Sequence, residues 1–166
     1  MKDDYATLYA FDRWANARML DACRKLTQEQ YVAEPVPGWT SVRSTVHHIA
    51  IVTDAWLRGL ANEFDGTVPS EADLATVDDA DRLLKRAYQR FEALLSTMTE
   101  ARLNTPVTFA RRNWSVTLPP WVVLRHIVNH TTYHRGQVAS KLKRFGIQQA
   151  ETDMVYFAKE LVPQPG

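Results

Sequence analysis

The stretch VLRHIVNHTTYHRGQ (residues 123–137) combines two patterns that together predict a fold and a function. Its apolar residues recur every three or four positions, which is typical of a helix that packs one face into a bundle. Its histidines lie four residues apart, at His126, His130 and His134. The only other histidines, His47 and His48, stand together far earlier in the chain. Every imidazole therefore falls in one of two short segments.

Outside this stretch the same helical period recurs in three more long segments. The expected helices span about residues 2–26, 41–62, 77–100 and 119–145. Prolines open the last of them, where a first turn tolerates them, and Gly146 ends it. Residues 106–117 place β-branched and aromatic side chains around a polar turn, which predicts a short hairpin or extended loop. Residues 153–160 predict a short helix or a packed tail.

These segments predict an all-α fold, a four-helix bundle, formed by one domain over residues 1–166. The net charge is +1 and no basic tract is present, so no nucleic-acid partner is expected. No apolar run approaches the roughly 20 residues of a membrane span, and the N-terminus lacks a signal-peptide pattern. Cys23 is the only cysteine, which allows no intrachain disulfide and indicates a small packed side chain. We expect a cytoplasmic protein.

Helical phase separates the five histidines. At about 100° per residue, His130 and His134 lie at the edge of the buried arc of the last helix, whereas His126 points toward solvent. His126 and His134 are about 12 Å apart along the helix axis, which is too far to share one ion. On the second helix, His48 flanks the buried stripe and His47 points away from it. Phase therefore selects His48, His130 and His134 as one set of three imidazoles.

Three imidazoles suit a single divalent metal ion. Zn²⁺ takes imidazole nitrogen at roughly 2.0–2.1 Å, and three protein ligands plus a water is its catalytic pattern. Zn²⁺ and Ni²⁺ are the expected ions, and Fe²⁺, Co²⁺ and Mn²⁺ also accept such ligands. Neutral ligands leave the full charge on the ion, which lowers the pKa of a bound water or thiol. The chain lacks the H-E-x-x-H pattern of zincin proteases. The alternative is that the histidines are hydrogen-bonded core residues without an ion.

The segment HTTYHRGQ (130–137) also resembles the H-x-x-x-H-R-G-Q signature of the DinB/YfiT-like family of metal-dependent proteins. The segments WAN (14–16), HIAIVTDAW (48–56) and MVYF (154–157) are similar to other elements of that family. The resemblance implies an up-down-down-up bundle, commonly a homodimer, with a divalent metal on three histidines. It transfers that role to His48, His130 and His134. Family members of known activity include transferases and isomerases that use low-molecular-weight thiols.

Several other residues have predicted roles in ion pairing, hydrogen bonding or proton transfer. Arg135 falls in the apolar arc of its helix, where a charge needs a partner, and Asp12 on the first helix is the candidate. Gln137 is placed to hydrogen-bond a ligand histidine. Asp54 and Tyr133 are candidate proton carriers, but no catalytic residue is identified. The five tryptophans are interpreted as core or rim packing.

The expected function is that of a metal-dependent enzyme acting on a small-molecule substrate. It would activate a water or a low-molecular-weight thiol for nucleophilic transfer or for hydrolysis. The alternative is a non-catalytic bundle that binds a metal or a small ligand. A fourth protein ligand in the site would favour this alternative.

Overall fold

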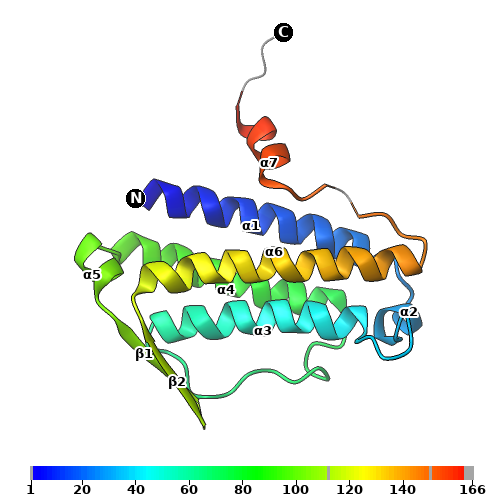
Figure 1. Cartoon of the computed structure of the whole chain (residues 1–166), viewed down its shortest axis with the longest axis horizontal. Helices are drawn as coiled ribbons and strands as arrows, with labels where there is room; N and C mark the ends of the chain where they lie inside the picture. The colour runs from blue at the N-terminus through cyan, green and yellow to red at the C-terminus, as the bar shows by residue number, and fades with distance from the viewer. Residues whose placement is uncertain (1, 112, 150, 163–166) are drawn as a thin grey trace.

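A computed structural model describes residues 2–111, 113–149 and 151–162 of the chain. Four long helices lie side by side, as the sequence predicts (Figure 1). They are α1 (Lys2–Cys23), α3 (Val42–Leu60), α4 (Val77–Thr97) and α6 (Pro120–Arg144). Helices α1 and α3 each contact both α4 and α6, so the four form a ring around one core. The four-helix bundle is confirmed.

Along the chain, the four long helices run up, down, down and up. Helices α1 and α6 run in one direction and α3 and α4 in the other (Figure 1). The two parallel neighbours, α3 and α4, are joined by residues 61–76, which cross back along the length of the bundle. Because α3 and α6 run in opposite directions, the C-terminal end of α3 lies at the same end of the bundle as the N-terminal end of α6 and the base of the hairpin (Figure 1).

Two of the predicted long helices end earlier than expected, and a short helix that was not predicted follows each of them. The first helix ends at Cys23 rather than near Leu26, and α2 (Gln28–Val32) follows from the capping box of Thr27 and Gln30. The third ends at Thr97 rather than near Glu100, and α5 (Glu100–Asn104) begins after the N-cap Thr99. Each has five residues, too few to show a hydrophobic period.

The predicted hairpin and C-terminal helix are both present. Strands β1 (Val107–Arg111) and β2 (Trp114–Leu118) pair antiparallel, with Phe109 opposite Val116. Helix α7 (Met154–Leu161) packs on α1, where Phe157 contacts Phe11 and Trp14. No helix in the described part of the chain is long and apolar enough to span a membrane.

A buried polar cluster joins α1 to α6 through the predicted Asp12–Arg135 ion pair. Arg135 Nη1 donates to Asp12 Oδ1 at 2.6 Å, and the side chains are 2% and 0% exposed. Tyr88 and Thr131 also donate hydroxyl hydrogen bonds to the Asp12 carboxylate. The ion pair is confirmed, and it is fully enclosed by the bundle.

Candidate metal centre

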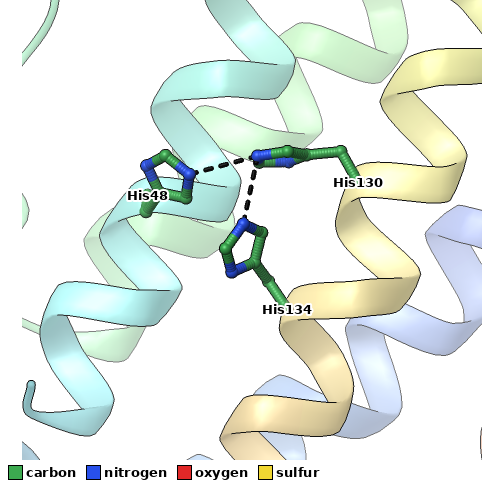
Figure 2. A group of neighbouring side chains, drawn as sticks. All are labelled: His48, His130 and His134. Atoms are coloured by element: carbon green, nitrogen blue, oxygen red, sulfur yellow. Dashed lines mark hydrogen bonds between the residues drawn. The ribbon is translucent and has the colours of Figure 1, made fainter. Parts of the chain in front are cut away.

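Three histidines from two helices point their Nε2 atoms at one another (Figure 2). His130 Nε2 lies 3.1 Å from His48 Nε2 and 3.1 Å from His134 Nε2. His48 comes from α3, whereas His130 and His134 stand one turn apart on α6. The structure thus brings together the three histidines that helical phase selected. Within residues 2–111, 113–149 and 151–162, no fourth His, Cys, Asp or Glu joins them.

The spacing of these nitrogens fits a small divalent ion. Two ligands held at roughly 2.0–2.1 Å from a tetrahedral ion are about 3.3–3.4 Å apart. The two observed Nε2–Nε2 distances of 3.1 Å are close to that value. Hydrogen bonding explains them less well, since His130 Nε2 carries at most one proton and faces two nitrogens. The donor set therefore fits a metal better than a mutually hydrogen-bonded trio.

Gln137 orients one of the three rings. His134 Nδ1 lies 2.7 Å from Gln137 Oε1, and with the amide oxygen facing the ring, Nδ1 donates the proton. That tautomer leaves the lone pair of His134 on Nε2, which is the atom that faces His48 and His130. Such a hydrogen bond fixes the ring of a metal ligand and raises its basicity. The predicted contact between Gln137 and a histidine is confirmed.

Burial favours the neutral form of His48 and His130, which is the form that a metal needs. Burial, together with the neighbouring rings of His134 and His48, lowers the pKa of His130 to about 4. Burial also lowers the pKa of His48, with His134 as the next largest cause. An imidazole near neutral pH normally spends part of its time protonated. His130 is instead neutral near pH 7, and the lowered pKa of His48 favours its neutral form as well.

The polar cluster around Asp12 sets the rotation of α6. Thr131 and Arg135 directly follow His130 and His134 in sequence, so they point about 100° around the helix from them. Both donate to Asp12 on α1, which fixes that face of α6 against α1. The histidine face is thereby held toward α3. The buried Asp12 carboxylate, together with the apolar face of α6, thus helps to hold two of the three imidazoles toward α3.

The other two histidines stay outside the group. His47 faces away from it, as predicted, but is half-buried because residues 61–76 pass over that face of α3. Its Nε2 donates to the backbone oxygen of Pro69 at 2.9 Å. His126 is exposed, and its ring centroid lies 5.6 Å from that of His130 and 5.5 Å from that of Trp56.

The candidate proton carriers differ in position. Asp54 is buried in ion pairs with Arg90 at 2.9 Å and with Arg58 at 3.8 Å, so its carboxylate is engaged away from the histidines. Tyr133 is 64% exposed, and its ring meets that of His134 edge-on with centroids 5.1 Å apart. Of the two, only Tyr133 adjoins the candidate centre.

Comparison with known proteins identifies the family of the chain. A sequence model of the DinB family matches residues 1–164. The chain belongs to the DinB family. It is 26% identical over 167 residues to Protein DinB of Bacillus subtilis strain 168, covering 92% of either sequence.

Two solved structures share the DinB fold. A DinB-like protein from Bacillus cereus ATCC 10987 matches with a TM-score of 0.69 at 24% identity, over 90% of this chain and 95% of that one. YfiT from Bacillus subtilis matches with a TM-score of 0.61 at 21% identity, over 88% of this chain and 90% of that one. YfiT is described as a probable metal-dependent hydrolase with an unusual four-helix bundle topology. The DinB family assignment inferred from residues 130–137 is confirmed.

Proposed function

We propose that this DinB-family chain is a divalent-metal-dependent enzyme whose ion is held by His48, His130 and His134. The observation that carries the proposal is the convergence of three Nε2 atoms, two pairs of them 3.1 Å apart. The ligand set is neutral, and no carboxylate or thiolate of the described residues belongs to it. A structurally similar protein, YfiT, is described as a probable metal-dependent hydrolase, which supports hydrolysis as the reaction.

The chain's own residues prepare the site for this role. When bound, the ion would lower the pKa of a water or thiol and polarise an electrophile. His48 and His130 supply lone pairs because burial disfavours their protonation. Gln137 holds the tautomer of His134, and Asp12 holds the face of α6 that carries two of the ligands. Three protein ligands, rather than four, leave a position for a reactant, which is the pattern of catalytic zinc sites.

Water and an external thiol are the two candidate nucleophiles. We propose water first, because hydrolysis is the activity attributed to YfiT. A low-molecular-weight thiol is the second, since a dication with neutral ligands also stabilises a thiolate. The protein's own thiol does not compete, because Cys23 is 1% exposed in the core and burial raises its pKa to about 12. A thiol reactant would therefore come from solution.

Cobalt substitution tests the site and separates the nucleophiles. We expect Co²⁺-loaded protein to show visible bands of a low-coordinate nitrogen site. Glutathione, bacillithiol or mycothiol is added in turn, and a sulfur-to-cobalt charge-transfer band would identify the thiol as the reactant. His48→Ala should abolish the cobalt bands. The control His47→Ala, which removes the adjacent histidine, should keep them. Wild-type protein without cobalt bands would refute the metal site.

The alternative is a non-catalytic metal-binding bundle. Such a site is commonly closed by a fourth protein ligand, as in structural zinc sites. The group of three histidines argues against closure within the described residues. Screening metal-loaded protein against ester, amide and lactone substrates distinguishes the two. Hydrolysis that His48→Ala removes would establish an enzyme, whereas tight metal binding without turnover of any substrate would favour the binding protein.

A further inference from the structure

A cavity of about 570 Å³ opens between α3, the segment that follows it and the β-hairpin. Ligand sites for small molecules typically span roughly 300–1,000 Å³ and are mainly apolar. The cavity is lined chiefly by apolar and aromatic side chains: Val52, Ala55, Trp56, Phe64, Phe109 and Trp114. None of the described residues that line it carries a charge. Its size and lining match those of a small-molecule site.

Aromatic rings from α3 and from both strands of the hairpin build the walls of this cavity. The Trp56 ring on α3 meets Phe109 of β1 edge-on at 4.8 Å between centroids, and Trp114 of β2 at 6.1 Å. Gly59 permits this packing, because a Cβ at that position would lie 2.7 Å from the Phe109 ring. The hairpin thus lies directly against α3. Phe109 is buried, whereas Trp114 remains 49% exposed and forms an open wall.

The cavity is next to the candidate metal centre. Val52 stands one helical turn beyond His48, about 6 Å along the axis of α3, and Trp56 one turn further. On α6, the ring of His126 bridges the two regions, with centroids 5.6 Å from His130 and 5.5 Å from Trp56. Because α3 and α6 are antiparallel, both paths lead from the histidines to the hairpin (Figure 1).

We propose that this cavity binds the apolar, uncharged part of the substrate, preferably an aromatic ring, while its reacting group lies at His48, His130 and His134. The inference rests on the proposed function and specifies its substrate class. A charged group would lose its hydration in this lining without gaining an oppositely charged partner, since Asn62 and Thr108 are the polar residues among those described there. An aromatic group would gain edge-to-face contacts with Trp56 and Trp114. The substrate is then a small electrophile with an aromatic or bulky apolar substituent, joined through a short linker.

Hydroxamates that differ only in their tail test the proposal. Zinc-loaded protein is titrated calorimetrically with acetohydroxamate and with phenyl-alkyl hydroxamates of one to five methylenes. We expect the best phenyl compound to bind about 10- to 100-fold more tightly than acetohydroxamate, as for burial of an apolar side chain. Affinity should peak at the tether that spans the turn from His48 to Val52. Equal binding of all compounds, or a steady rise with each methylene, would overturn the proposal.

A pair of tryptophan variants gives the matched control. Trp114→Ala removes the open wall and should weaken the best phenyl compound about 2- to 10-fold, leaving acetohydroxamate unchanged. Trp39→Ala removes a comparably exposed ring, 40% against 49%, that contacts Arg144 near the N-terminal end of α3. It should change neither compound. Equal effects of the two variants on the phenyl compound would contradict the assignment.

A probe without a metal-binding group separates this inference from the proposed function. Absence of acetohydroxamate binding to wild-type protein would count against the proposed metal-dependent function. Binding of 4-phenylbutan-1-ol, which has no metal-binding group, then tests the cavity by itself. Ligand-observed NMR on metal-free protein should detect this alcohol in wild type and Trp39→Ala, and a weaker signal in Trp114→Ala. Absence of binding to wild type, or a signal that Trp114→Ala leaves unchanged, would overturn the assignment of the cavity.

Discussion

Removal of the Asp12 carboxylate should destabilise the bundle far more than removal of a surface carboxylate. Asp12→Ala leaves the guanidinium of Arg135, which is 2% exposed, without its counter-ion. Breaking a buried ion pair on one side typically costs about 3–5 kcal/mol. In a chain of this size each kcal/mol shifts the melting temperature by about 2–4 °C. The expected decrease is therefore about 6–20 °C, measured by circular dichroism at 222 nm.

Two further variants show whether the buried charge is the cause. Asp21→Ala removes a carboxylate from the same helix that is exposed and pairs with Arg24, so it should change stability by no more than about 0.5–1 kcal/mol. The double variant Asp12→Leu/Arg135→Met removes both charges and should be more stable than Asp12→Ala. An Asp12→Ala protein that melts within 2 °C of wild type would refute the reasoning. A double variant as unstable as the single one would assign the cost to the lost hydrogen bonds instead.

Three other predictions concern the metal and the thiol. A chelator should lower the melting temperature by about 5–10 °C, relative to protein at a free metal concentration 100-fold above Kd. The helical circular dichroism should persist, because the core folds without metal, and loss of the helical signal on chelation would contradict this. Gln137→Ala should weaken metal affinity about 10- to 100-fold in competition with a chromogenic chelator, and Gln137→Glu should retain it, because a carboxylate also accepts from His134 Nδ1; unchanged affinity in Gln137→Ala would show that the contact does not orient the ring. Since burial raises the pKa of Cys23 to about 12, almost no thiolate is present at pH 8, and Ellman's reagent should react only after denaturation; rapid labelling of native protein would show that the core opens there.

Local periodicity was sufficient to predict the long helices and the three histidines that meet. Side-chain direction within a helix follows from position alone, so His48 was separable from His47 without knowledge of the neighbouring helices. The Asp12–Arg135 pair was predictable because a charge inside an apolar arc requires a partner from another helix.

Features that depend on distant contacts were not predictable from the residues. The residues gave no signal that Phe109 would pack over Gly59, since 50 positions separate them and the packing depends on where the hairpin begins. The crossover over His47 was missed for the same reason, because nothing local to Pro69 indicates which helix face it covers. The parallel order of α3 and α4 was expected only through the DinB resemblance. The sequence indicates only packing roles for Trp56 and Trp114, because their shared cavity exists only once the hairpin lies on α3.

The metal content of purified protein tests the central claim most directly. Protein prepared without a metal-affinity tag, together with alanine variants of the five histidines, is analysed by inductively coupled plasma mass spectrometry. Wild type, His47→Ala and His126→Ala should carry close to one divalent ion per chain, because neither ring joins the group of three. His48→Ala, His130→Ala and His134→Ala should each be nearly empty, because two imidazoles make a much weaker site than three. Metal retained by His48→Ala but lost from His47→Ala, or equal loss from all five variants, would contradict the account.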